Sequence, residues 1–294
     1  MLEFKGVYPA SITPMSPEGS LNEEVFCKVM EFNIEAGVHG FWVAGGAGES
    51  VLLDDDENKR IAKLAVGQAR GRAKNIMHVG APTTKRAAYM AEHAAGAGVD
   101  AICCVPPFFS KTSEKGIVEH YRVIGAAANL PLFVYNLPEC TGVEITPELM
   151  GKIQDGVPQL TGLKHSAPTL SYIRDFAKMG LSCFVGNSNL MLPALTIGGS
   201  GCIDGPLNVA PEFWLEIWNA YQEGDLKRAE DAQARATEVS NFELEGLYHA
   251  SLKTALSERL GVECGEPRPP QPALTSEERE ILKGNLVKLG LLKQ

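Results

Sequence analysis

The sequence lacks any apolar run long enough to cross a membrane. A transmembrane helix needs about 20 consecutive apolar residues, and the longest apolar stretches of the chain, such as residues 101–109, are far shorter. The first residues, Met1 to Lys5, contain no apolar segment typical of a secretory signal peptide. We therefore expect a soluble, cytoplasmic protein with no membrane partner.

Positive charge is scarce and scattered. The chain carries 27 Lys and Arg against 36 Asp and Glu, a formal net charge of -9. Proteins that bind nucleic acid usually carry clustered Lys and Arg that neutralise phosphates. No such cluster occurs, so nucleic acid is not expected as a partner. The glycine-rich segment Gly45-Gly46-Ala47-Gly48-Glu49 fits neither the GxGxxG nor the Walker pattern of nucleotide-binding proteins.

Metal-ligand spacings are missing as well. The seven cysteines form no CxxC pair, and the six histidines show no paired spacing. No metal is therefore expected, and a zinc-dependent enzyme such as a zinc aldolase is less favoured than an enzyme that works without a metal. An odd number of cysteines without a pairing pattern is typical of reduced, mostly buried thiols, as in cytoplasmic proteins.

What the sequence does contain is a regular alternation of short apolar segments with longer amphipathic ones. Amphipathic segments with apolar residues spaced by three and four predict helices, for example at 22–36, 55–70, 85–97 and 114–128. Eight apolar segments predict strands, at residues 7–13, 40–44, 76–80, 101–105, 132–135, 161–164, 183–185 and 201–203. Eight such units close naturally into a (β/α)8 TIM barrel. An open doubly wound sheet is the alternative, but its glycine fingerprint is absent.

The pattern changes after Ala210, where only helices are predicted. They cover residues 211–221, 225–239, 242–260 and 276–292, with a proline-rich connector at 267–272. We therefore expect a catalytic barrel at residues 1–223 and a C-terminal three-helix extension at 224–294.

Candidate catalytic residues follow the predicted strands, where TIM barrels carry their active sites. Lys164 ends a short apolar strand, and a buried amine that gives up its proton is a nucleophile toward carbonyls; the alternative is a lysine that extends into water. Tyr135 ends the preceding strand and is either a proton shuttle or a rim tyrosine. The glycine-rich turn at Gly46 and Ala47 offers backbone N–H groups to an anion, or is a plain βα turn.

These segments resemble the N-acetylneuraminate lyase and dihydrodipicolinate synthase family in order and spacing. The resemblance rests on Ser11-Ile12-Thr13-Pro14-Met15, Gly45-Gly46-Ala47-Gly48-Glu49, Tyr135-Asn136-Leu137-Pro138, Gly162-Leu163-Lys164, Gly186-Asn187-Ser188-Asn189 and Asn208-Val209-Ala210-Pro211. It implies a (β/α)8 barrel, usually a homotetramer, that forms a covalent lysine imine with pyruvate and needs no cofactor.

The resemblance also implies roles for individual residues. Lys164 would form the Schiff base, and Tyr135 would shuttle protons. Gly46 and Ala47 would hold the pyruvate carboxylate, with Ile203 behind the pocket. The rest of the substrate would face the segment that contains Gly186, Ser188 and Asn189.

The chain departs from the family at several of these positions. Gly46 and Ala47 replace two hydroxyl residues, so proton transfer must use Ser166, a water or the substrate carboxylate. By the resemblance, Cys140 takes the place of an arginine that dihydrodipicolinate synthases have in common. The absence of this arginine disfavours dihydrodipicolinate synthase activity. Asp204 is a further departure that either forms a local turn or reaches the substrate.

The resemblance therefore predicts a lyase that cleaves a 2-keto-3-deoxy acid into pyruvate and an aldehyde, with an N-acetylneuraminate-like substrate favoured. A 2-keto-3-deoxy acid dehydratase, an aldolase of the 4-hydroxy-2-oxoglutarate or keto-deoxy-gluconate type, and a keto-acid-binding protein without catalysis remain open alternatives.

Overall fold

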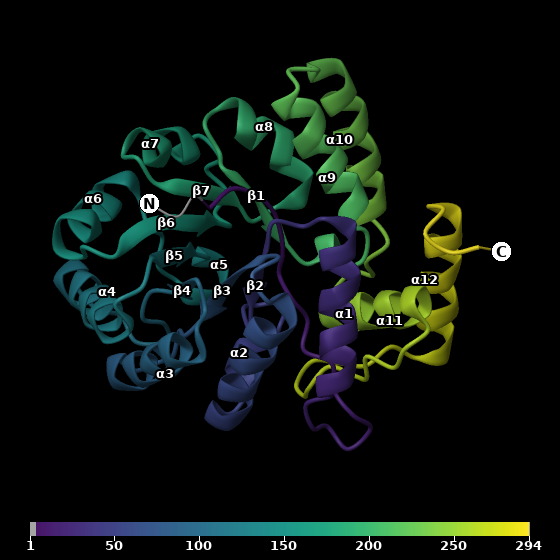
Figure 1. The fold of residues 1–294 in the computed structure, drawn as a ribbon, viewed down its shortest axis with the longest axis horizontal. Helices are drawn as coiled ribbons and strands as arrows, with labels where there is room; N and C mark the ends of the chain where they lie inside the picture. Colours follow the sequence, from purple (N-terminus) through teal and green to yellow (C-terminus); the bar gives the residue numbers. More distant parts are fainter. Residues whose placement is uncertain (1–3, 294) are drawn as a thin grey trace.

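Eight parallel strands form a nearly closed barrel in the computed structural model, which describes residues 4–293 (Figure 1). Neighbouring strands follow the order β1-β8-β7-β6-β5-β4-β3-β2. Ala10 forms a bridge to Trp42, and the Ser11 amide donates to the Trp42 carbonyl at 3.0 Å, which joins the two ends of the sheet. The strands are β1 (Gly6–Pro9), β2 (Gly40–Val43), β3 (Lys74–His78), β4 (Ala101–Cys104), β5 (Leu132–Asn136), β6 (Leu160–His165), β7 (Ser182–Val185) and β8 (Gly201–Asp204).

Helices surround this barrel. They are α1 (Glu23–Ala36), α2 (Asp55–Ala69), α3 (Thr84–Ala97), α4 (Glu114–Ala128), α5 (Pro138–Thr141), α6 (Pro147–Gly156), α7 (Tyr172–Lys178), α8 (Met191–Thr196), α9 (Pro211–Gln222), α10 (Leu226–Ser240), α11 (Tyr248–Leu260) and α12 (Ser276–Lys288), with short 3-10 helices η1 (Ser50–Leu52), η2 (Ser188–Leu190) and η3 (Pro206–Asn208). The chain thus has the predicted TIM-barrel fold with extra C-terminal helices.

The start of α2 illustrates how the sequence sets a helix boundary. The Asp54 carboxylate accepts the Glu57 amide at 2.8 Å, and the Glu57 carboxylate accepts the Asp54 amide at 3.0 Å. This capping box satisfies two amides that the first helical turn leaves without partners. Ile61, Ala62 and Ala65 then face inward and are buried.

Aromatic rings fill part of the barrel interior. Phe133 is fully buried and meets Phe4 with ring centroids 5.1 Å apart and Phe184 at 6.2 Å. Tyr8 meets Phe184 edge to face at 4.9 Å. Removing one such ring typically costs about 3–5 kcal/mol of stability.

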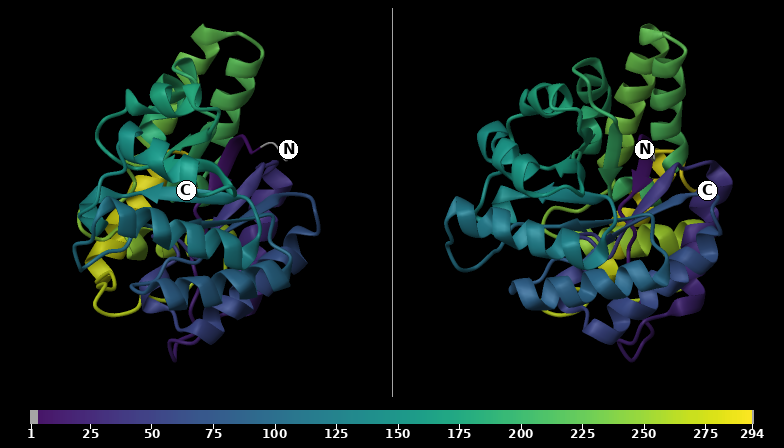
Figure 2. Two further views of the ribbon diagram at one scale, coloured as in Figure 1. Left: turned by 90° about the vertical axis from the view of Figure 1, so that its left-hand side faces the viewer. Right: turned by 60° about the vertical axis from the view of Figure 1, so that its left-hand side comes forward.

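Beyond the barrel, α9 and α10 lie side by side and extend from one end of the molecule (Figure 2). Helix α11 reaches α1, where the Arg259 guanidinium lies over the Phe32 ring, and α12 packs on α11 (Figure 1). None of the helices among residues 4–293 is long and apolar enough to cross a membrane. The proposed division between a barrel at 1–223 and an extension at 224–294 stays a prediction.

Three predicted boundaries are wrong by four residues or more. The strand predicted at 7–13 ends at Pro9, because β1 pairs only with β8 and β8 ends opposite it at Asp204. The helix predicted at 242–260 begins at Tyr248, since residues 241–247 form turns that include a left-handed Gly246 with φ of 73°. The helix predicted at 276–292 ends at Lys288.

All seven cysteines are free, and five of them are buried. Cys27 is half-buried, and Cys140 is exposed. The expectation of unpaired, mostly buried thiols is therefore confirmed.

Candidate active site

Lys164 lies inside the C-terminal mouth of the barrel. It occupies the penultimate position of β6, pairs in register with Tyr135 of β5, and is only 4% exposed. Its Nζ lies 4.7 Å from the centroid of the Tyr135 ring and 5.7 Å from that of Trp42. Among residues 4–293, no carboxylate forms an ion pair with it. The amine is thus enclosed by aromatic faces. Their π electrons attract a cation, but they carry no full negative charge that would neutralise it.

Gly186 makes room for this lysine. A Cβ atom at position 186 would lie 1.8 Å from the Ser166 Oγ and 3.0 Å from the Lys164 Cε. Any side chain there would therefore displace both groups. The Ser166 hydroxyl is buried and has no hydrogen-bond partner among the described residues, so it is available to a ligand bound at the lysine.

Tyr135 stands between Lys164 and the glycine-rich turn. Its ring meets Trp42 edge to face at 5.4 Å. A Cβ atom at Gly46 would lie 3.5 Å from the Tyr135 hydroxyl, which is ordinary contact distance. A side chain at position 46 would therefore touch the phenol, and the glycine leaves the phenol without that neighbour.

The turn after β2 presents two amides without partners. The Gly48 and Glu49 amides donate back to the Gly45 and Gly46 carbonyls, both at 3.0 Å. Within residues 4–293, the Gly46 and Ala47 amides donate to no protein acceptor. Successive free amides in a turn form a concavity that binds anions, so the predicted carboxylate site has the donors that it needs.

The C-terminal helices hold this turn from outside the barrel. Glu49 and Lys253 of α11 form a buried ion pair at 2.5 Å, with side chains 0% and 1% exposed. Glu49 also accepts the Arg268 amide at 2.6 Å. The His249 Nε2 contacts the Gly46 carbonyl at 2.9 Å. Burial lowers the pKa of Lys253, and Glu49 opposes that shift.

Lys164, Tyr135 and the turn at Gly46 and Ala47 line one open cleft of about 1190 Å³ at the mouth of the barrel. Its wall includes seven of the ten residues predicted from the sequence: Gly46, Ala47, Tyr135, Lys164, Ser166, Gly186 and Asp204. Ile203 is fully buried in β8 and does not line it. Ser188 and Asn189 line a neighbouring cavity of about 440 Å³.

Several residues that were not predicted also border these cavities. Among them, Tyr248 and His249 come from the first turn of α11, Glu144 follows α5, and Glu243 lies in the turn before α11. No local pattern links Tyr248, His249 or Glu243 to the strand ends, because their position depends on how the C-terminal helices dock. Their chemical character, acidic or aromatic, is visible in the sequence, but their location is not.

His78 lies on the other side of Tyr135. Its ring centroid is 6.3 Å from that of Tyr135. His78 lines a third cavity, of about 350 Å³, which also reaches Gly46. Burial and then the Lys164 charge lower the pKa of His78 to about 4. The imidazole is therefore neutral at physiological pH.

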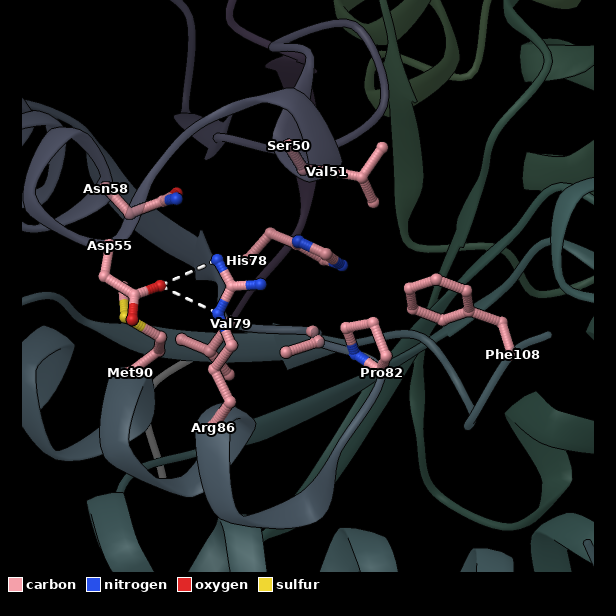
Figure 3. A pocket seen from close by; sticks show the side chains of 12 residues that line it. Ser50, Val51, Asp55, Asn58, His78, Val79, Pro82, Arg86, Met90 and Phe108 are labelled. Atoms are coloured by element: carbon pink, nitrogen blue, oxygen red, sulfur yellow. Dashed lines mark hydrogen bonds and ion pairs between the residues drawn. The ribbon is translucent and has the colours of Figure 1, made fainter. Parts of the chain in front are cut away.

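A smaller hollow of about 80 Å³ lies on the outer side of His78. Figure 3 shows the His78 ring pointing toward the gap between Val51 and Phe108, with the Arg86 and Asp55 side chains joined beside it. Among residues 4–293, no group of three or more His, Cys, Asp or Glu side chains is arranged to hold a metal ion.

Comparisons with known proteins agree with this arrangement. The sequence model of the dihydrodipicolinate synthetase family matches residues 3–289. The chain is 33% identical to an uncharacterised DapA-like lyase of Halobacterium salinarum, covering 99% of this chain and 96% of the relative. It is 31% identical to the 4-hydroxy-tetrahydrodipicolinate synthase of Methanopyrus kandleri, covering 99% and 98%.

Solved structures give the same picture. The sialic acid aldolase of Ruminococcus gnavus superposes with a TM-score of 0.93 at 29% identity, covering 98% of this chain and 97% of the other. The dihydrodipicolinate synthase of Aquifex aeolicus superposes with a TM-score of 0.91 at 29% identity, covering 99% and 100%. The fold agrees with these structures and the family model covers nearly the whole chain, so the chain belongs to the dihydrodipicolinate synthetase family.

Proposed function

We propose that the protein is a pyruvate-dependent lyase that cleaves a 2-keto-3-deoxy acid into pyruvate and an aldehyde through an imine on Lys164. The observation that carries this proposal is the buried Lys164 amine beside Tyr135, facing the same cleft as the free amides of Gly46 and Ala47. Members of the family use a lysine Schiff base with pyruvate and need no cofactor, and we propose the same for this chain, without a metal.

The reaction follows from these positions. The neutral Lys164 amine adds to the C2 carbonyl of the substrate, and loss of water from the carbinolamine leaves an imine. Tyr135, or a group acting through it, removes the proton of the C4 hydroxyl. The C3–C4 bond breaks, its electron pair moves into the imine as an enamine, and the aldehyde departs. Protonation at C3 and addition of water then release pyruvate and the free amine.

Binding of the keto-acid carboxylate requires no side-chain hydroxyl at positions 46 and 47. The Gly46 and Ala47 amides supply two donors, and the Ser166 hydroxyl beside Lys164 supplies a third. Position 46 has no side chain that could pass protons to and from Tyr135. We propose that Ser166, a water molecule or the substrate carboxylate relays these protons instead.

The rest of the cleft favours a substrate without a second negative charge. Lys164 is the only Lys or Arg that lines the cleft in the described residues, whereas Glu139, Glu144 and Asp204 all border it. Cys140 also lies in this wall, at the position where the resemblance implies an arginine in dihydrodipicolinate synthases. This lining supports an N-acetylneuraminate-like acid over the dihydrodipicolinate synthase reaction, and it leaves dehydratase and other keto-deoxy acid aldolase activities as alternatives.

A non-catalytic keto-acid-binding protein is a second candidate, favoured by the missing hydroxyls at Gly46 and Ala47. Release of pyruvate from a panel of 2-keto-3-deoxy acids, N-acetylneuraminate first, separates the two functions. We expect turnover by the native protein and loss of it in Lys164→Ala and Tyr135→Phe. Binding of pyruvate without turnover of any acid in the panel would favour the binding protein.

We also propose that the protein is a cytoplasmic homotetramer. The seven free cysteines fit a reducing compartment. Self-association is supported by large apolar side chains on the surface, Phe109 and Val51 above all, since Phe109 is fully exposed and held at a left-handed φ of 71°. Sedimentation analysis tests it: four copies are expected, and a concentration-independent monomer would contradict it.

A further inference from the structure

The neighbouring cavity of about 440 Å³ opens beside the catalytic cleft. The two share Asn187, Asp204 and Tyr248 as a common wall. The other side of the cavity comes from the end of α10 and the turn that follows it, including Ser240 and Glu243. A substrate held at Lys164 by its keto acid therefore has room to place its far end against these residues.

Asp204 is fixed in this wall by backbone donors. One carboxylate oxygen accepts the Ser188 amide at 2.8 Å, and the other accepts the Gly205 amide at 2.8 Å. A carboxylate held through both oxygens keeps one orientation, and each oxygen has a lone pair left to accept from a ligand. The turn-forming and ligand-binding interpretations of Asp204 are thus compatible with each other.

Glu243 lies on the opposite side of the cavity from Asp204, and its carboxyl group differs from that of Asp204 in its hydrogen bonding. Its Oε1 is buried and has no hydrogen-bond partner within residues 4–293. Burial, and then the charge of Asp204, raise the pKa of Glu243 to about 8. The carboxyl group therefore carries a proton at neutral pH and can donate a hydrogen bond.

An acceptor and a donor that face one cavity match an alcohol, because each hydroxyl group both donates and accepts. No Lys or Arg lines this cavity in the described residues, and Glu245 adds a further carboxylate to its wall. A carboxylate or phosphate on the aldehyde would therefore meet repulsion without a cation to offset it.

Building on the proposed lyase function, we propose that Asp204 and Glu243 bind the aldehyde product and select an uncharged aldehyde that carries several hydroxyl groups, with Asp204 as acceptor and Glu243 as donor. Glu243 is then a specificity residue that touches the substrate but not the bond that breaks.

The proposal predicts a pH dependence with a definite sign. Above about pH 8, Glu243 loses its proton, its donor disappears and a second negative charge faces Asp204. The titratable and hydroxyl groups that share the cavity with Glu243 are Asp204 of β8, Tyr248 of α11, Glu245 of the same turn, Ser240 of α10 and Ser188. None of them is a cation that would stabilise the ionised form.

The test measures condensation, the reverse reaction, with pyruvate at saturation and the aldehyde varied from pH 6.5 to 9.5. N-acetylmannosamine is the uncharged probe, mannosamine the cationic one and succinic semialdehyde the anionic one. The variants are Glu243→Gln, which keeps a donor that does not titrate, and Glu243→Ala, which has none. Glu238→Gln is the matched control, because Glu238 is an exposed carboxylate of α10 that lines neither the cavity nor the catalytic cleft.

For the native enzyme we expect the uncharged aldehyde to have the highest kcat/KM, and its KM to rise about tenfold between pH 7 and 9, as expected for the loss of one hydrogen bond to a buried group. Glu243→Gln should keep the pH 7 value of KM within about twofold and abolish the rise. Glu243→Ala should raise KM about tenfold at every pH. The KM for pyruvate should not change in any variant.

A preference for the anionic or cationic aldehyde, an unchanged KM in Glu243→Ala, or a pH dependence that persists in Glu243→Gln would each overturn the inference. Borohydride trapping of pyruvate on the same samples separates this outcome from failure of the proposed function. If an adduct forms at Lys164 but the Glu243 variants leave the KM for the aldehyde unchanged, only the aldehyde subsite is refuted. If the native enzyme forms no adduct, the imine itself is refuted.

Discussion

Replacing Lys253 by methionine tests whether the C-terminal helices hold the carboxylate-binding turn. The Lys253–Glu49 pair is buried on both sides, and Glu49 is the N-cap residue of η1, directly after Gly48. The methionine side chain fills most of the lysine volume but carries no charge. Among residues 4–293, the Glu49 carboxylate then keeps only the Arg268 amide as a partner.

The cost follows from the burial of both groups. Removing one partner of a buried ion pair leaves the other charge desolvated, which typically costs about 3–5 kcal/mol. For a chain of this length we therefore expect the melting temperature Tm to fall by roughly 10 °C. Because Glu49 accepts the Arg268 amide and its own amide donates to Gly46, movement of Glu49 shifts the turn that carries the two free amides.

The measurements are the midpoint of thermal unfolding and the KM for pyruvate in condensation. Lys253→Met should lower the unfolding midpoint and raise the KM for pyruvate, with a smaller change in kcat. Lys283→Met is the matched control, because Lys283 forms an exposed pair with Glu258 at 3.3 Å and such pairs contribute less than about 1 kcal/mol. The double variant Glu49→Gln with Lys253→Met removes both charges and should recover most of the lost stability.

A Lys253→Met protein with an unchanged Tm would refute the stability estimate. A lower Tm with an unchanged KM for pyruvate would refute the positioning role and leave the pair as a purely structural contact.

Two further predictions concern glycines in the cleft. Gly186→Ala should abolish imine formation while the protein still folds, because the new Cβ would meet the Ser166 hydroxyl and the Lys164 side chain; pyruvate trapping with borohydride checks this, and an undiminished adduct contradicts it. Gly46→Ser should raise kcat about tenfold or more, since its Cβ fits 3.5 Å from the Tyr135 hydroxyl and returns a hydroxyl for proton transfer; an unchanged or lower kcat would show that proton transfer does not depend on that position.

Much of the fold follows from local sequence patterns. The apolar segments and the amphipathic segments between them predict all eight strands and the helices around them, because each βα unit folds by the same local rules. The errors fall where tertiary contacts decide. The strand at 7–13 is shortened because its neighbour β8 ends, and the helix at 242–260 is shortened by a left-handed turn.

The site is predictable to the extent that it lies on strand ends. Lys164 and Tyr135 are adjacent because β5 and β6 are consecutive strands in register. Ser188 and Asn189 follow β7 but face the neighbouring cavity, because the Asn187 side chain accepts the Asn189 amide at 3.0 Å and turns the segment into η2. Glu243, Tyr248 and His249 escape prediction because they reach the two cavities only through the docking of the C-terminal helices.

The imine on Lys164 is tested most directly by trapping. The protein is incubated with pyruvate and borohydride, digested, and the modified peptide is identified by mass spectrometry, with Lys164→Ala as the control. We predict a single adduct that maps to Lys164 in the native protein and none in the variant. An adduct on another lysine, or turnover of a 2-keto-3-deoxy acid by Lys164→Ala, would contradict the account.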